Sequence, residues 1–382
     1  LMGDDSDDDD DDSEEEEGAP PPPPPAAPPS KRGKGAKPPP PPAVPAIVDV
    51  AAELAASEAA ADAAAAAAAR ALAIEPPSIP TRWWGSEEED ACQRRPLRLT
   101  AAVHSHRGEH KSHANEDRYA LVAEMNAEVE KQRVRRSNGA AADGGADGGE
   151  AAPPPTNAFF GVYDGHGGSA AAAHTAARLH ALLAVDASWR TDPRAALAGA
   201  FAAVEAELSL SYESTRDKSG SCALGLLLRG HRALLANVGD CRALVVRAES
   251  SHAPPYAQLT TDQRATEPGE QSRILKAGGQ ISDGRVWGAL IPSRTLGDFP
   301  WKAKGPGLSA LPEFCSYEIG PYDRYIILGS DGLFDVLTNK AIARIAGRMS
   351  GKAQKVANEL VKELKKRPGH DDQTLVVVAL EH

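Results

Sequence analysis

The stretch FFGVYDGHGG (159–168) places a carboxylate, Asp164, directly after a run of large apolar residues. Such a run predicts a buried β-strand, and the glycines that follow it let the backbone approach a ligand closely. An ionised carboxylate at the end of a buried strand is costly unless it is paired or holds a metal ion. The stretch therefore indicates a ligand site at a strand end, although a glycine turn with a capping residue accounts for it about equally well.

Three further carboxylates occur in similar settings. They are Asp117 in NEDRYALV (115–122), Asp331 in YIILGSDGLFDVL (325–337) and Asp371 in HDDQTLVVVAL (370–380). Each of them alone is explained by a turn, a helix cap or a strand-edge pair. Few lysines or arginines lie beside them in the sequence, so the four together favour a converging cluster that binds divalent cations.

Residues 1–45 form a tail of biased composition. Residues 4–17 hold twelve acidic side chains and no basic one, and residues 18–45 are dominated by proline. The formal charge of the whole chain is −12, so the acidic run accounts for all of it. A disordered, acidic and proline-rich tail is predicted, because like charges repel one another and proline favours extended chain.

The rest of the chain divides into a linker and a folded domain. Residues 46–96 are rich in alanine and predict a weak helix followed by a linker. A domain is expected over 97–382, with a low-complexity insertion at 126–157 between two of its strands. Runs of strands with helices grouped in pairs predict an α+β fold, in which two antiparallel sheets are packed together and flanked by helices.

Apolar runs and helical patterns give the expected elements of this domain. Besides the strands that carry the four carboxylates, strands are expected at 98–106, 222–228 and 233–239, and helices at 170–185, 193–214, 270–279, 338–348 and 352–367.

Nine segments of the chain resemble, in the same order, the motifs of the metal-dependent protein Ser/Thr phosphatases of the PP2C type. No single motif is specific, but their order over about 97–380 is. The segments are NEDR (115–118), VYDGHGG (162–168), DKSGSCA (217–223), ANVGDCRAL (236–244), LTTDQR (259–264), AGGQI (277–281), SRTLGD (293–298), SDGLFDVLT (330–338) and DDQT (371–374).

This resemblance implies a PP2C-like α/β sandwich that hydrolyses phosphoserine and phosphothreonine in proteins. Two Mg²⁺ or Mn²⁺ ions would activate a water molecule, so no covalent phosphoenzyme is needed. A flap around 263–292 would contribute to substrate choice. The implied metal ligands are Asp117, Asp164, the Gly165 carbonyl, Asp331 and Asp371, with Glu116 acting through water, Asp217 assisting a third, weaker ion and His166 as the general acid.

The main departure from the family pattern is Ser112, which stands where an arginine usually clamps the substrate phosphate. Lys111 and His113 flank it and are the candidate phosphate-binding residues, but neither has the planar fork of arginine. The alternative function is therefore a pseudophosphatase, a scaffold or binding protein with weak turnover or none.

Two other kinds of site are less well supported. The C-x5-R patterns at Cys92 and Cys241 lack the glycine-rich loop of a cysteine phosphatase. The spacing of His104, His106, His110 and His113 fits no firm zinc template, so these histidines are predicted to be ordinary strand and loop residues.

Composition also predicts the surroundings of the protein. Four scattered cysteines without a CxxC pair indicate a reducing compartment, so a signalling phosphatase of the cytoplasm or nucleus is expected. We expect phosphorylated proteins as substrates and a monomer that binds neither nucleic acid nor membrane. The acidic residues 4–17 suit a basic protein partner.

Overall fold

The computed structural model describes residues 97–108, 111–137, 157–248, 253–349, 351–367 and 371–382. These residues belong to one compact unit of the chain. The predicted tail at 1–45 and the predicted weak helix and linker at 46–96 lie outside the described residues and remain predictions.

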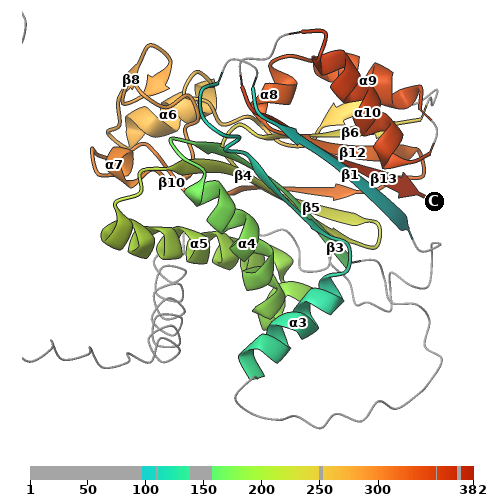
Figure 1. Cartoon of the computed structure of the whole chain (residues 1–382), viewed down its shortest axis with the longest axis horizontal. Coiled ribbons are helices and arrows are strands. Elements are labelled where there is room, and N and C mark those ends of the chain that lie inside the picture. Colours follow the sequence, from blue (N-terminus) through green and yellow to red (C-terminus); the bar gives the residue numbers. More distant parts are fainter. Residues whose placement is uncertain (1–96, 109–110, 138–156, 249–252, 350, 368–370) are drawn as a thin grey trace, which may run out of the picture. The chain divides into compact units, whose positions relative to one another are not determined.

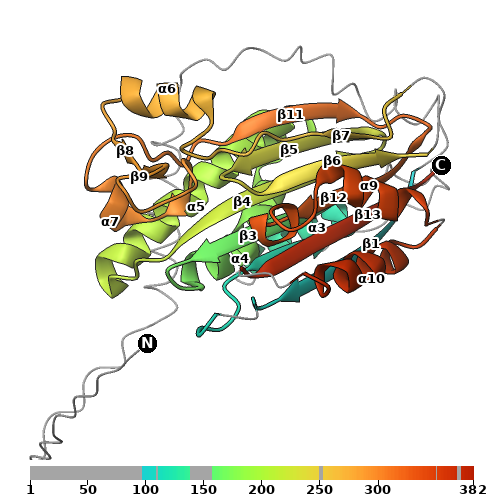
Figure 2. The same ribbon diagram turned by 90° about the horizontal axis from the view of Figure 1, so that it is seen from above.

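Two antiparallel sheets form the centre of the described domain (Figures 1 and 2). The five-stranded sheet has the order β1 (Arg98–His106), β13 (Gln373–Glu381), β12 (Asp323–Gly329), β6 (Arg242–Arg247) and β7 (Tyr256–Gln258). The other sheet has the order β11 (Glu313–Glu318), β5 (Arg232–Val238), β4 (Gly220–Arg229), β3 (Asn157–His166) and β2 (Arg118–Val122), and the short strand β10 (Leu296–Gly297) pairs with β4.

The facing sides of the two sheets form the central core. Phe160 and Leu224 of one sheet pack in the same buried cluster as Ile326 and Val376 of the other. Successive side chains of a strand point to opposite faces, so Val377 belongs to a different cluster, on the helix side of its sheet. Strands buried on both faces explain why these segments read as continuous apolar runs.

Helices cover the outer face of each sheet, which gives four layers (Figure 1). None of the helices in the described part of the chain has the length and apolar character that crossing a membrane requires. The first sheet is covered by α8 (Asp331–Phe334), α9 (Asn339–Gly347) and α10 (Ala353–Leu364), and the second by α3 (Met125–Ser137), α4 (Ala170–Val185), the 3-10 turn η2 (Ala187–Arg190) and α5 (Pro193–Thr215).

The predicted sandwich of two antiparallel sheets flanked by helices is therefore confirmed. One helix was not expected: α3 occupies the first part of the segment 126–157, which the sequence predicts to be a low-complexity insertion. Residues 138–156 of that segment lie outside the described residues.

A small lobe lies at one end of the sheets, beside α5 (Figure 2). It contains α6 (Pro268–Lys276), the two-stranded sheet of β8 (Ile281–Ser282) and β9 (Arg285–Val286), and α7 (Phe299–Lys302). Buried Glu270 of α6 binds both Arg273 and Arg294, with shortest distances of 2.7 and 2.6 Å. This lobe includes the predicted flap at 263–292, and we call it the flap lobe.

Candidate active site

Four of the predicted metal ligands lie at one end of the two sheets. Asp117 immediately precedes β2 and Asp164 lies near the end of β3, and these two strands are antiparallel neighbours. Asp331 follows β12 by two residues and Asp371 precedes β13 by two, and these strands are also antiparallel neighbours. Each sheet therefore supplies two carboxylates to the same end of the sandwich, and we call these four residues the acidic cluster.

Hydrogen bonds join the two pairs of strands at this end. The Ser330 hydroxyl, next to Asp331 in the chain, donates to Oδ2 of Asp117 at 2.9 Å. Buried Asp372 accepts hydrogen bonds from the backbone N–H groups of Gly108 at 2.9 Å and Glu116 at 2.8 Å. The loop that carries Glu116 and Asp117 is thus fixed against the start of β13.

The carboxylates at this end resist ionisation. The side chain of Asp117 is almost inaccessible, and burial is the main reason that its pKa rises to about 6. Burial, followed by repulsion from the neighbouring carboxylates, also raises the pKa of Asp164 and Asp331 well above the ordinary value. Such a cluster is stabilised by any cation that enters it.

The donor set of this cluster fits a hard divalent cation. Oδ1 of Asp117 and Oδ1 of Asp331 are buried and have no hydrogen-bond partner among the described residues. Buried carboxylate oxygens are normally satisfied, and carboxylates and carbonyls are the ligands that Mg²⁺ and Mn²⁺ prefer. Within the described residues, no three acidic, histidine or cysteine side chains already meet closely enough to hold an ion.

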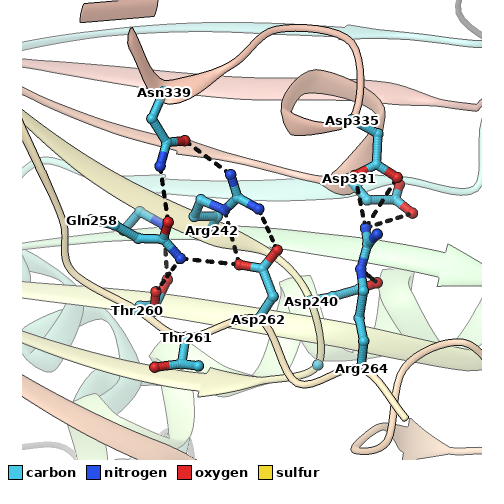
Figure 3. Close-up of polar contacts among 12 residues, drawn as sticks. Asp240, Arg242, Gln258, Thr260, Thr261, Asp262, Arg264, Asp331, Asp335 and Asn339 are labelled. Atoms are coloured by element: carbon cyan, nitrogen blue, oxygen red, sulfur yellow. Dashed lines mark hydrogen bonds and ion pairs between the residues drawn. The ribbon is translucent and has the colours of Figure 1, made fainter. Parts of the chain in front are cut away.

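Two basic side chains supply positive charge beside these carboxylates. Lys111 forms an ion pair with Asp371. The Arg264 guanidinium lies between Asp240 on one side and Asp331 with Asp335 on the other (Figure 3). The nitrogen–oxygen distances of Arg264 are 3.0 Å to Asp240, 3.8 Å to Asp331 and 3.0 Å to Asp335.

Two other predicted metal-binding residues, Gly165 and Asp217, lie outside this set of four carboxylates. Gly165 lies against the backbone of Glu116, and a Cβ at this glycine would come within 2.4 Å of the Glu116 carbonyl oxygen. A glycine is therefore needed for this close approach. Asp217 lies in the loop between α5 and β4, where its Oδ1 accepts hydrogen bonds from the backbone and hydroxyl of Ser219.

The predicted general acid, His166, is the last residue of β3. Its Nε2 lies 2.6 Å from Oδ2 of Asp298, a carboxylate that is only 1% exposed. Burial lowers the pKa of His166, but the hydrogen bond and the negative charges of Asp298, Asp240 and Glu116 outweigh burial and raise it. The charged imidazole is therefore favoured in this position.

The two predicted phosphate-binding residues are placed differently from each other. Lys111 is directed at the acidic cluster through its ion pair with Asp371 and lies 3.7 Å from Asp372. His113 is 43% exposed, and its Nδ1 lies 2.9 Å from the carbonyl of Ala114 and 3.7 Å from Oε1 of Glu116. Of the two, Lys111 is the one that the structure brings into the cluster.

Sequence reasoning singled out no role for Asp240, Arg264, Asp298 or Asp372. The first and third were within reach, because each follows a glycine in a quoted motif, as VGD and LGD. Asp164 and Asp331 also lie beside a glycine, but in their case the glycine follows the carboxylate. The contacts of Arg264 depend on folding and leave no signal in the sequence.

The family is shown by comparison with known proteins. The family model described as "Protein phosphatase 2C" matches residues 127–372, and the chain belongs to this family. It is 33% identical over 230 residues to a protein of Arabidopsis thaliana named "Probable protein phosphatase 2C 27", covering 58% of each chain. It is 33% identical over 241 residues to "Probable protein phosphatase 2C 2" of Oryza sativa subsp. japonica, covering 58% of this chain and 61% of that one. The match thus spans less than two thirds of these relatives' length.

Solved structures show the same fold. The serine-threonine phosphatase 2C from Toxoplasma gondii aligns with a TM-score of 0.55 and 20% identity, covering 74% of this chain and 95% of that one. A C. elegans sex determining protein aligns with a TM-score of 0.56 and 21% identity, covering 75% and 65%. The predicted resemblance to the PP2C type is therefore confirmed.

Proposed function

We propose that this chain is a metal-dependent phosphatase that hydrolyses phosphoserine and phosphothreonine in proteins. The observation that carries the proposal is the acidic cluster at one end of the sandwich, with buried carboxylate oxygens that have no partner among the described residues. Membership of the protein phosphatase 2C family supports the same reaction class.

The residues that would hold the ions are Asp117, Asp164, the Gly165 carbonyl, Asp331 and Asp371, with Glu116 acting through water and Asp217 assisting a third ion. When bound, Mg²⁺ or Mn²⁺ ions supply an activated water and neutralise the phosphoryl oxygens. The oxygen-only donor set supports these ions rather than zinc, which favours nitrogen and sulfur.

The protein's own residues bind the substrate and deliver a proton. Lys111 and His113 are proposed to contact the phosphoryl group. As the bond between phosphorus and the Ser or Thr oxygen breaks, His166 donates a proton to that oxygen, so the product is a neutral alcohol. The water oxygen remains on phosphorus, and inorganic phosphate leaves.

We further propose phosphorylated proteins as substrates, a monomeric enzyme, and a place of action in the cytoplasm or nucleus. A basic protein remains the proposed partner of the acidic residues 4–17. The flap lobe lies at one end of the sheets (Figure 2), and Arg264 of the predicted flap contacts Asp331 of the acidic cluster. This lobe would therefore contribute to substrate choice.

Phosphate release from a phosphothreonine peptide by the full chain tests this function. We expect turnover with Mg²⁺ or Mn²⁺ and none with EDTA. Asp331→Ala should abolish turnover, whereas Asp186→Ala, which removes a capping carboxylate of η2, should leave it near wild type. Full activity in a folded Asp331→Ala protein contradicts the proposal.

Calorimetric titration with the metal distinguishes the phosphatase from the alternative, a pseudophosphatase that acts as a scaffold or binding protein. An inactive wild type that still binds metal points to Ser112 and to a binding protein. An inactive wild type that binds no metal argues against both the phosphatase and the pseudophosphatase.

A further inference from the structure

The hydrogen bond between His166 and Asp298 is built from two distant parts of the chain. Nε2 of His166 and Oδ2 of Asp298 are 2.6 Å apart, at the length of a charge-assisted bond. Asp298 is 1% exposed, while His166 is 28% exposed. In the described part of the chain, His166 is the only side chain that forms a hydrogen bond or ion pair with the Asp298 carboxylate.

The backbone of Asp298 is held in an uncommon conformation. Its φ is 55° and its ψ is 32°, in the left-handed region that non-glycine residues seldom adopt. Its N–H donates to the carbonyl of Ser219 at 3.1 Å, and its carbonyl accepts from the N–H groups of Trp301 and Lys302 at 2.9 and 3.0 Å. Strain that is held by several bonds is typical of a residue that is placed for function.

Gly220 leaves the space in which the two side chains meet. It pairs with His166 between β3 and β4 and with Gly297 of β10. A Cβ at Gly220 would lie 2.1 Å from Oδ2 of Asp298 and 2.4 Å from Nε2 of His166. A side chain at this position would break the contact between His166 and Asp298. The hydrogen bond therefore requires a glycine at position 220.

We propose that Asp298 is the positioning residue of His166. A carboxylate only accepts hydrogen bonds, so it fixes Nε2 as the N–H that faces it and sets the rotation of the ring. Nδ1, which makes no hydrogen bond to the described residues, is then directed to the substrate. This inference rests on the proposed phosphatase function, in which Nδ1–H gives its proton to the leaving Ser or Thr oxygen while Nε2–H stays on Asp298.

The test compares two substrates of different leaving group. A Ser or Thr alkoxide needs a proton as it departs, whereas p-nitrophenolate is a stable anion that departs without one. Asp298→Asn retains the shape and the left-handed backbone, because asparagine tolerates that region, but it offers a donor as well as an acceptor. Glu207→Gln is the matched control, since Glu207 is another carboxylate that binds a histidine, His174, at 2.7 Å between α4 and α5.

With the full chain and Mn²⁺, Asp298→Asn should lower kcat for a phosphothreonine peptide roughly 10²-fold and kcat for p-nitrophenyl phosphate less than about threefold. Glu207→Gln should change neither. Gly220→Ala, which displaces the contact without removing a partner, should show the same selectivity as Asp298→Asn. Equal losses on both substrates, or no loss at all, overturn the inference.

Nitrogen NMR of histidine-labelled protein reads the ring directly, with His166→Gln to assign the signal. The inference requires Nε2 of His166 to carry a proton in the wild type and the pattern to change in Asp298→Asn. If the wild type hydrolyses neither substrate, the phosphatase proposal fails, and this spectrum alone decides for or against the positioning role.

Discussion

At the scale of single residues, the Asp117 carboxylate destabilises the metal-free fold at neutral pH. Its pKa is about 6 in the folded protein and 3.8 in the ordinary reference. Between these values the unfolded chain binds fewer protons than the folded one, so stability falls as pH rises. Above the folded pKa the loss is complete, at about 3 kcal/mol.

Asp117→Asn should therefore stabilise the metal-free protein. We expect the free energy of unfolding to rise by roughly 1–3 kcal/mol at about pH 7.5, and the gain to shrink towards zero at about pH 4. Urea denaturation in EDTA measures both values. A variant less stable than wild type at the higher pH would show that the carboxylate is already satisfied.

Arg264 has the opposite effect, because among the described residues no other lysine or arginine pairs with Asp240, Asp331 or Asp335. Asp240 beside it is 3% exposed, so removing the guanidinium leaves a buried charge. Arg264→Met should cost roughly 3–5 kcal/mol in the metal-free protein. Mg²⁺ should restore part of the loss.

Thermal and urea denaturation with and without the ion check the effect of Arg264→Met. Arg324→Met, at an exposed position of β12, is the matched control and should change stability by less than about 0.5 kcal/mol. A loss no larger than that of the control would mean that Arg264 is not the main counter-charge.

At the scale of elements, one carboxylate, that of Glu270, ties α6 of the flap lobe to the segment that follows β9. Burial opposes the charge of Glu270, but hydrogen bonds from Arg294, Arg273 and Ser293 outweigh it and bring the pKa of Glu270 to about 2. A small apolar cluster of Ala265, Ile274 and Val286 and several backbone hydrogen bonds also support the lobe. Local opening should therefore depend strongly on this one residue.

Glu270→Gln should loosen the lobe selectively. We expect amide hydrogen exchange in α6, β8 and β9 to accelerate at least about tenfold, while β4 and β13 keep their protection. Glu267→Gln on the same helix start is the control, because the Glu267 side chain makes no capping hydrogen bond. Uniform acceleration throughout the domain would instead indicate global destabilisation.

The elements that the sequence predicted best are those with a strong pattern of their own. The helix expected at 170–185 is α4 with the same bounds, and the strand at 98–106 is β1. Helix α3 was missed because its sequence, MNAEVEKQRVRRS, is mostly polar and gives little periodic signal. Strand β11 was missed because it is only half-buried and takes its place by pairing with β5.

The candidate site follows the same division. Asp117, Asp164, Asp331 and Asp371 were found because a charge beside an apolar run is conspicuous. Asp298 acts on His166 across 132 positions of sequence, and such a contact is set by tertiary packing alone. Its local motif gives no indication of its partner.

At the scale of the whole molecule, stability should reside in the core between the sheets. Ile326 is fully buried there, whereas Leu275 of α6 is 57% exposed. Ile326→Ala should cost roughly 2–5 kcal/mol and Leu275→Ala less than about 0.5 kcal/mol, as measured by urea denaturation. Similar losses for the two would mean that the lobe contributes as much as the sandwich.

The position of β13 between β1 and β12 has a consequence for biosynthesis. The strand at the end of the described domain joins its first strand to the rest of the five-stranded sheet, and Asp371 and Asp372 immediately precede it. When the residues that follow β12 are still inside the ribosome, the nascent chain has neither the complete five-stranded sheet nor the complete acidic cluster. The acidic cluster is therefore completed in a single late step, when β13 emerges and pairs with β1 and β12.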